Sequence, residues 1–240
     1  MSKNRQLTQF LICTVLAACA SQPQKPPAPA RQSEPRVLTV TPAIARQVRD
    51  AQAAMQTGNY PDGIAKAQAL ESMHDLTPYE VHVINEMLGY GFAHDGELPR
   101  AADYLERGFA DGFLAATQRQ QRVNALATLN YQLKNFAKAV SFGTLAAREG
   151  FADEKTYVLV SQAYYLQGDY RAAATFTGDR VQAVIARHEV PSESSLQVIL
   201  SSCAKLQDRG CEVHALEKLV TYHSTPQYQI QLDGLRHRSP

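Results

Sequence analysis

The sequence predicts an all-α protein built from about five helix-turn-helix units that follow one another along the chain. Alanine is abundant, tryptophan is absent, and no long stretch shows the apolar-polar alternation typical of a half-buried strand. Small and aromatic residues also recur in one frame, in which Phe136 and Tyr170 stand one period apart. A fixed period of this length, about 34 residues, is typical of helical repeat arrays.

The first residues have the features of a targeting signal. Lys3 and Arg5 precede an apolar run of about 12 residues, whereas a helix that crosses a bilayer needs about 20. The stretch "LAAC", which ends at Cys19, resembles the bacterial lipobox. That resemblance implies that residues 1–18 are a lipoprotein signal peptide and that Cys19 carries the lipid. It also implies, because Ala20 follows, that the mature protein stays in the outer membrane and faces the periplasm.

An ordinary secretory signal, cut after Ala18 or Ala20, is the alternative and would leave a soluble periplasmic protein. In either case a linker follows, because residues 21–36, "SQPQKPPAPARQSEPR", hold five prolines and almost nothing to bury. Such a stretch cannot offset the entropy lost on ordering. We therefore expect residues 19–40 to be a lipidated N-terminus and an extended, disordered linker.

The repeat frame is clearest in residues 159–176, "LVSQAYYLQGDYRAAATF". It places a small residue, an aromatic, a glycine, a second aromatic and an alanine at fixed spacing, here Ser161, Tyr164, Gly168, Tyr170 and Ala173. This pattern resembles the tetratricopeptide repeat (TPR), a helix-turn-helix unit. The resemblance implies a right-handed α-solenoid of about five TPR-like units over residues 41–235, with a groove as its working surface and a disordered tail at 236–240.

Other copies of the frame lie on both sides of this one. Two copies are centred on Phe136 and Leu98, a weaker one on Tyr60, and a divergent fifth unit follows Pro191. The steps from Tyr60 to Leu98 and from Leu98 to Phe136 are equal and exceed the TPR period, which predicts one extra helical turn in each of these units. The aromatics at 60, 136 and 170 are expected to begin second helices, and the glycines at 58, 96 and 168 to end first helices in the left-handed conformation.

The wider stretch 43–232 is similar to the TPR proteins that accompany TonB-ExbB-ExbD energy-transduction systems in Gram-negative envelopes. The segments that carry this similarity are "TPYEVHVINEMLGYGF", "NALATLNYQLKNFAKAV", "YVLVSQAYYLQGDYRAA" and "LEKLVTYHSTPQY". The chain departs from that pattern at Cys203 and Cys211, which stand where an aromatic and a turn residue are expected.

The chain shows no signature of catalysis, of a metal site or of a cofactor. Its seven histidines include no pair at helical i, i+4 spacing, and its cysteines form no C-x-x-C motif. Nucleophile-elbow, phosphate-loop and dinucleotide-binding patterns are also absent. The nearest acid-base clusters, Glu80 with His82 and His94 with Asp95 and Glu97, are expected to be solvated helix ends.

The charge balance argues against nucleic acid as a partner. Cleavage after Ala18 removes Lys3 and Arg5 and no acidic residue, so 22 basic side chains stand against 23 acidic ones in the mature chain. Nucleic-acid binding generally requires a basic face, which a chain of this composition does not suggest.

Cys203 and Cys211 are eight residues apart, on the first helix of the last unit and near the start of its second. An oxidising periplasm would favour a disulfide that closes this hairpin. Two buried or half-exposed thiols are the alternative, because spacing alone does not show how far apart the Cα atoms lie.

The TPR resemblance also implies which side chains point into the groove. In this frame they are Tyr90, Thr128, Tyr131, Gln162 and Tyr165, and Asn124, one turn before Thr128, could bond a peptide backbone. Tyrosine supplies a large contact area and a hydroxyl for pairing. The alternative is that these tyrosines only pack between neighbouring units.

Together these features predict a non-catalytic scaffold: a lipid-anchored, periplasm-facing TPR protein that docks another envelope protein in its groove. The partner could belong to an energy-transduction, secretion, pilus or cell-wall complex. A self-associating structural component of the envelope is the alternative, followed by an enzyme or a ligand carrier. The oligomeric state remains open.

Overall fold

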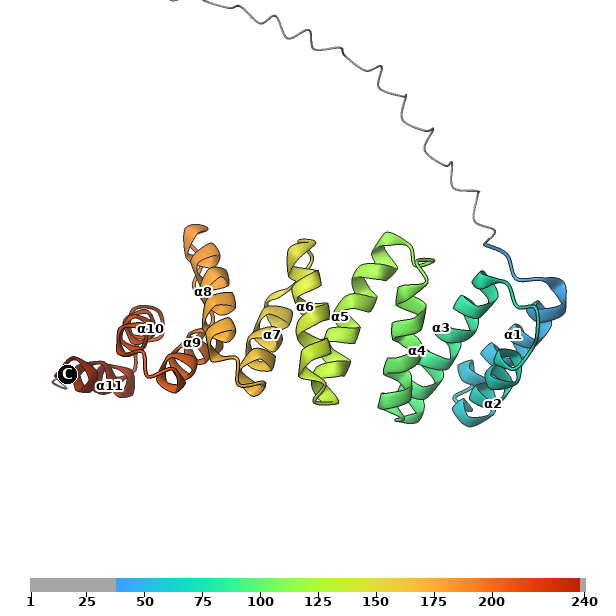
Figure 1. Ribbon diagram of the computed structural model, residues 1–240, viewed down its shortest axis with the longest axis horizontal. Helices are drawn as coiled ribbons and strands as arrows, with labels where there is room; N and C mark the ends of the chain where they lie inside the picture. The colour runs from blue at the N-terminus through green and yellow to red at the C-terminus, as the bar shows by residue number, and fades with distance from the viewer. Residues whose placement is uncertain (1–37, 238–240) are drawn as a thin grey trace, which may run out of the picture. The chain divides into compact units, whose positions relative to one another are not determined.

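The computed structural model of the chain describes residues 38–237, and all regular structure in this part is helical (Figure 1). The predictions for Cys19, the signal peptide and residues 19–37 of the linker lie outside the described residues. The helices are α1 Pro42–Gln56, α2 Tyr60–Glu71, α3 Pro78–Asp95, α4 Leu98–Ala110, α5 Ala116–Gln132, α6 Phe136–Arg148, α7 Glu154–Leu166, α8 Tyr170–Ala186, α9 Glu193–Lys205, α10 Arg209–Tyr222 and α11 Pro226–His237.

Ten of these helices form five hairpins, from α1–α2 to α9–α10, and α11 packs on the last of them. Consecutive helices pack against each other throughout the described chain, so each hairpin is stacked on the next. First helices also meet directly, since α1 packs on α3, α5 on α7 and α7 on α9. The predicted fold class, an all-α solenoid of TPR-like units, is therefore confirmed.

The turn inside each unit lies where the repeat frame predicted it. The first residues of α2, α4, α6 and α8 are Tyr60, Leu98, Phe136 and Tyr170. The three predicted glycines have positive φ, with 79° at Gly58, 87° at Gly96 and 81° at Gly168, where a side chain would be strained. In the third and fifth units Lys134 and Gln207 adopt the same conformation, at φ 59° and 57°.

The extra turn predicted from the two longer steps belongs to the first helices. Helices α3 and α5 have 18 and 17 residues, whereas α7 has 13. The step from Phe136 to Tyr170 spans the shorter α7, and it is therefore the shorter step.

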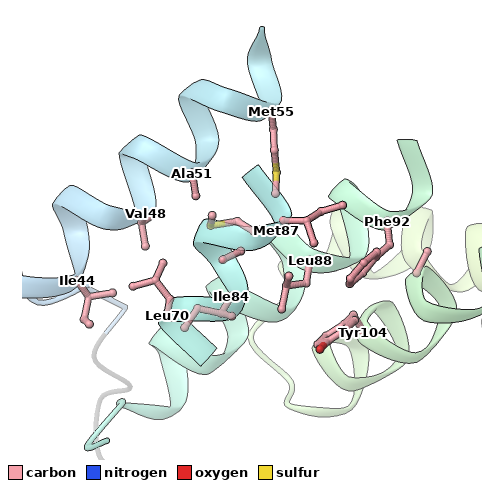
Figure 2. Close-up of a cluster of buried hydrophobic side chains, with 13 residues drawn as sticks. Ile44, Val48, Ala51, Met55, Leu70, Ile84, Met87, Leu88, Phe92 and Tyr104 are labelled. Atoms are coloured by element: carbon pink, nitrogen blue, oxygen red, sulfur yellow. The ribbon is translucent and has the colours of Figure 1, made fainter. Parts of the chain in front are cut away.

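Small residues allow the paired helices to approach closely. A Cβ atom added at Gly89 of α3 would lie 2.5 Å from Leu105 Cδ2 of α4, a distance that real Cβ atoms do not show. Ala101, Ala139 and Ala173 on the second helices are fully buried. The core of the first two units fills the space between α1, α2, α3 and α4 with large apolar side chains (Figure 2).

One expectation is wrong: Glu80 and His82 are not at a solvated helix end. Glu80 is 1% exposed and His82 7%. The Glu80 carboxylate accepts hydrogen bonds from the Thr77 N–H at 2.8 Å and from the Thr41 N–H and hydroxyl at 2.8 and 2.7 Å. Burial would raise the pKa of Glu80, but these hydrogen bonds outweigh it and lower the pKa to about 2. By contrast His94, Asp95 and Glu97 are exposed, as expected.

The predicted tail also begins too early. Arg236 and His237 are the last residues of α11, and at this end of the chain the described part stops at His237. Arg209 Nη2 of α10 donates to the Leu235 and Arg236 carbonyl oxygens, at 2.5 and 3.4 Å, and Arg236 pairs with Glu217 at 2.6 Å. The two bonds from Arg209 satisfy carbonyls that a helix C-terminus leaves unpaired, and the Arg236–Glu217 pair holds the last turn of α11 against α10.

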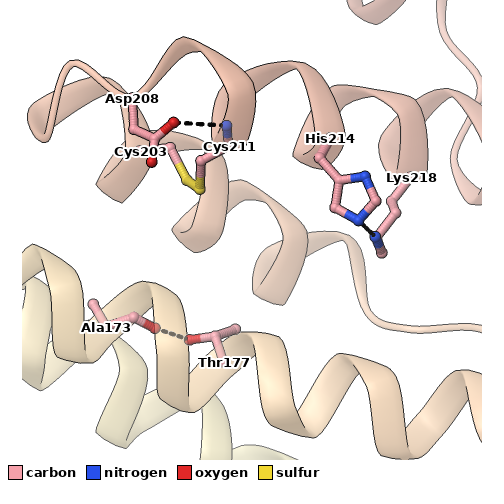
Figure 3. The surroundings of a disulfide bond; sticks show 7 residues. All are labelled: Ala173, Thr177, Cys203, Asp208, Cys211, His214 and Lys218. Carbon is pink, nitrogen blue, oxygen red and sulfur yellow. Dashed lines mark hydrogen bonds between the residues drawn. A yellow bond between two sulfur atoms is a disulfide. The ribbon is translucent and has the colours of Figure 1, made fainter.

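Cys203 on α9 and Cys211 on α10 are joined by a disulfide, with their Cα atoms 5.6 Å apart (Figure 3). The Asp208 carboxylate caps α10 by accepting the Cys211 N–H at 3.0 Å, which places Cys211 in the first turn next to α9. This Cα separation lies within the usual range for a disulfide.

We expect protein purified without reductant to show no alkylation of Cys203 or Cys211 until a reductant is added. The Cys203 side chain is fully buried, so it should react slowly even then without denaturant. Peptide mass spectrometry with and without prior reduction measures this directly. Full labelling of both residues in unreduced, denatured protein would show that the bridge is absent.

Candidate functional site

Two adjoining hollows lie over the first helices of the third, fourth and fifth units. They have volumes of about 450 and 380 Å³ and share Tyr131, Gln162 and Ser194 in their linings. We call the joined feature the tyrosine groove and define it by six lining residues from α5, α7 and α9: Thr128, Tyr131, Gln162, Tyr165, Ser194 and Ser201. Four of the six residues predicted from the sequence therefore lie at one site.

The two tyrosines are held by contacts at the edge of the groove. The Tyr131 hydroxyl donates to Gln162 Oε1 at 3.0 Å, which links α5 to α7. Each ring meets the first aromatic of its own second helix edge to face, with centroids 5.7 Å apart for Tyr131 and Phe136 and 5.1 Å for Tyr165 and Tyr170. Edge-to-face packing at these distances orients the rings. Both interpretations of the tyrosines thus have support, since they pack within the solenoid and line its hollow.

Caps set where α7 and α9 begin, and so place the groove residues in register. The Asp153 carboxylate accepts the Thr156 N–H and hydroxyl at 2.8 and 2.7 Å, and these bonds lower the pKa of Asp153. At the next unit Ser192 caps α9 by accepting the Ser195 N–H at 3.3 Å. Because Asp153 fixes the start of α7, it also sets the register in which Gln162 meets Tyr131 of α5 and Tyr165 lines the groove.

Asn124 does not line the groove. Its Oδ1 lies 3.3 Å from the Thr156 hydroxyl, whose shorter contact is with Asp153, so the half-buried Asn124 amide makes a contact between α5 and α7. Thr128 does line the groove, but its hydroxyl donates to the Asn124 carbonyl oxygen at 3.0 Å within α5. The structure therefore gives Asn124 a contact between units, whereas a contact with a peptide stays a prediction.

Tyr90 belongs to a different hollow, of about 470 Å³, between α1 and α3. It is 48% exposed, and its ring lies 4.3 Å from His94 and 6.2 Å from Tyr60, between centroids. The structure thus separates Tyr90 from the other tyrosines.

Polar pairs in the same hollow connect the second unit to the residues that follow it. His82 Nδ1 lies 2.9 Å from Asp111 Oδ2, and the Arg122 guanidinium of α5 donates to both Glu86 oxygens at 2.6 and 2.5 Å. A bidentate pair of this kind fixes orientation as well as contributing energy. No serine, threonine or cysteine lines this hollow.

Neither hollow offers a metal site. Within residues 38–237, no three His, Cys, Asp or Glu side chains are arranged to hold an ion. No helix in this part of the chain has the length and apolar character needed to span a membrane. The tyrosine groove presents mainly aromatic rings, hydroxyls, amides and aliphatic side chains to a ligand.

Sequence reasoning missed the contribution of α9, where Ser194, Gln197 and Ser201 line the groove. The Gln197 amide donates to the Tyr228 hydroxyl of α11 at 2.7 Å, and Tyr228 donates to Glu193 at 2.5 Å. The hydrogen bond to Glu193 raises the pKa of Tyr228. The fifth unit departs from the repeat frame, so no aromatic marks these positions in the sequence.

Comparison with known proteins supports the fold alone. No family model matches the chain, and no curated protein matches it. Among solved structures, MamA AMB-1 is 16% identical with a TM-score of 0.52, covering 82% of this chain and 95% of its own. Nearly identical TPR-like repeats from Podosopora anserina are 15% identical with a TM-score of 0.45, covering 82% of this chain and 98% of theirs.

Proposed function

We propose that this protein is a non-catalytic scaffold that docks another protein in the tyrosine groove. The observation that carries the proposal is the continuity of the groove across three units, with Tyr131 and Tyr165 at equivalent positions of α5 and α7. Large aromatic side chains in a hollow are the residues that most often dominate binding energy at protein interfaces. A ligand that crosses three units would contact a longer surface than a single closed pocket offers.

The absence of reactive chemistry in the groove also favours a scaffold. The residues that line it are mostly hydroxyls, amides, tyrosine rings and aliphatic side chains, and the acidic one, Glu154, is paired with Arg180 at 3.0 Å. Acid-base or nucleophilic catalysis needs an activated group within reach of the substrate, and no histidine or cysteine lines the groove.

We further propose that the scaffold is an outer-membrane lipoprotein that faces the periplasm, anchored through lipid on Cys19. The lipobox-like "LAAC" and the proline-rich stretch after it support this location. The partner would then be another envelope protein, and the resemblance to TPR proteins of TonB-ExbB-ExbD systems makes an energy-transduction complex the first to examine. Secretion, pilus and cell-wall complexes follow.

Replacing both Tyr131 and Tyr165 by serine should abolish capture of the partner from solubilised membranes by tagged protein. Both tyrosines line the groove but are half-buried, and Tyr131 also packs against the buried cluster around Ala139 and Val160. We therefore expect the two changes together to cost about 2 kcal/mol or more of stability. Circular dichroism at the assay temperature reports folding, and a pull-down with quantitative mass spectrometry reports capture.

The matched control is Tyr90→Ser, which removes an exposed tyrosine from the separate hollow of α1 and α3. It should leave capture unchanged. Undiminished capture by the folded double variant would show that the partner does not bind in the tyrosine groove. An equal loss of capture in Tyr90→Ser would assign binding to the first two units.

Changing Cys19→Ser should release the protein from the outer membrane. A single substitution would remove the acyl chains, each of whose buried methylenes contributes about 0.8 kcal/mol to membrane affinity. Fractionation and intact mass measure the outcome. Recovery of the variant in the same membrane fraction at the same mass would contradict lipidation without touching the groove.

A further inference from the structure

The tyrosine groove is nearly neutral. Only two of its lining side chains carry charge at neutral pH, Glu154 and Lys155, and both lie at the start of α7. Glu154 is already occupied, since it accepts from Arg180 Nε at 3.0 Å and from the Ser192 hydroxyl at 3.1 Å. A ligand therefore meets one cationic side chain at one end and none along the rest of the groove. Phosphate groups and runs of acidic residues, which are usually bound by clustered arginines, would find no such cluster here.

What the groove offers along its length is hydrogen-bond donors. Gln162 accepts the Tyr131 hydroxyl through Oε1, which leaves the two N–H groups of its amide for a ligand. Tyr165 and Ser201 also line the groove, and their hydroxyls form no hydrogen bond with residues 38–237. These uncharged donors suit the carbonyl oxygens of a peptide backbone.

Between the donors the groove presents flat and aliphatic surface. Val158 and Leu159 line it beside Tyr131, and Val198 and Leu166 line it beside Tyr165. Leu166 is 53% exposed, which is unusual for a leucine and leaves apolar area for a partner to cover.

A proline-rich segment has the complementary chemistry. Proline has no N–H, so such a segment presents carbonyl oxygens without the donors that would need acceptors. Its polyproline II helix is largely formed before binding, and recognition domains for it combine aromatic grooves with donors to its carbonyls. We propose that the tyrosine groove binds a proline-rich segment of its partner in the polyproline II conformation, with prolines on Tyr131 and Tyr165 and a carbonyl oxygen on Gln162. This inference rests on the proposed docking function and names the class of peptide.

The probe is a fluorescently labelled, capped peptide of Pro-Pro-Ala repeats, about ten residues long, titrated into the full chain and followed by anisotropy. We expect saturable binding that changes less than about twofold between about 50 and about 300 mM salt, because few charges take part. A matched peptide with every proline replaced by alanine should bind at least about tenfold more weakly, since it must first order its backbone.

Two variants of Tyr165 distinguish the contribution of its ring to peptide binding from that of its hydroxyl. Tyr165→Ser should weaken the probe about tenfold or more, and Tyr165→Phe, which keeps the ring, should weaken it only a few-fold. Tyr90→Ser should leave the affinity unchanged, because Tyr90 lies in the hollow of α1 and α3. Equal binding of the alanine peptide, a loss of more than about tenfold over that salt range, or equal loss in Tyr90→Ser would each overturn the proposal.

The two proposals can fail separately. If membrane capture depends on Tyr131 and Tyr165 but the probe does not bind, the docking function stands and the class of peptide is wrong. If the probe binds through Tyr165 while capture is unaffected by the double variant, the peptide class stands and the docking of the captured partner lies elsewhere.

Discussion

Ala173→Trp should lower the free energy of unfolding by about 3 kcal/mol or more, the upper end of what overpacking costs. Ala173 is fully buried in α8, which packs on both α7 and α9. Figure 3 shows it among the surroundings of the disulfide, with its carbonyl oxygen accepting the Thr177 hydroxyl at 2.6 Å. An indole there would have to separate the helices or bend α8.

For a solenoid of this size the change corresponds to a fall of about 6 to 12 °C in melting temperature. Thermal unfolding followed by circular dichroism measures it. The matched control is Ala183→Trp, on the same helix but exposed, which should shift the transition by little. Equal shifts for both variants would show that the alanine position of the repeat frame does not mark a closely packed contact between helices.

Glu80→Gln should destabilise the protein by about 2 kcal/mol at neutral pH and by progressively less as the pH is lowered. Lowering the pKa of Glu80 to about 2 corresponds to at most about 3 kcal/mol of stabilisation of the folded state. Screening by solvent near the surface of the solenoid reduces this contribution. The folded state binds fewer protons at Glu80 than the unfolded state between about pH 2 and 4.5, so this stability is present above that window and lost as pH falls through it.

Urea unfolding of both proteins at a series of pH values gives the difference in free energy directly. We expect the difference to be constant above about pH 5 and to approach zero near pH 2, where the wild-type carboxyl is protonated like the amide. Glu97→Gln is the control, because Glu97 is exposed and its side chain does not cap α4. A pH-independent difference for Glu80→Gln would show that the carboxylate charge is not what Thr41 and Thr77 stabilise.

Much of the fold was predictable because it depends on local spacing. A helix must stop before Tyr60, Leu98, Phe136 and Tyr170, and a glycine two residues earlier allows that stop without strain in three of the four turns. The remaining turn, in the third unit, has Lys134 at this position with φ 59°. The sequence gives no conformational signal there, and the packing of α5 on α6 holds the backbone. His188, at φ 60°, is a similar case between α8 and α9.

The candidate site was predictable only where the repeat is regular. Tyr131 and Tyr165 lie one repeat period apart, and because α5 and α7 end at equivalent positions, both tyrosines line the same hollow. That they bind a partner stays a prediction. Asn124 lies on the same face of α5, but its side chain contacts Thr156 of the next unit. This contact depends on how closely α5 and α7 approach each other. Ser194, Gln197 and Ser201 line the groove because α9 packs on α7, although the sequence of α9 departs from the repeat frame.

The sequence by itself determined the helical class, the order of the units and the positions of the turns, because these follow from residues within one helical turn of each other. Only the tertiary structure decided which polar groups are buried and which surfaces are left open. Glu80 shows the difference: its bond to Thr77 is a local capping box, whereas its bond to Thr41 spans 39 residues and exists because α1 packs on α3. Burial and hollows depend on distances between helices, and those are set by side chains that are far apart in the chain.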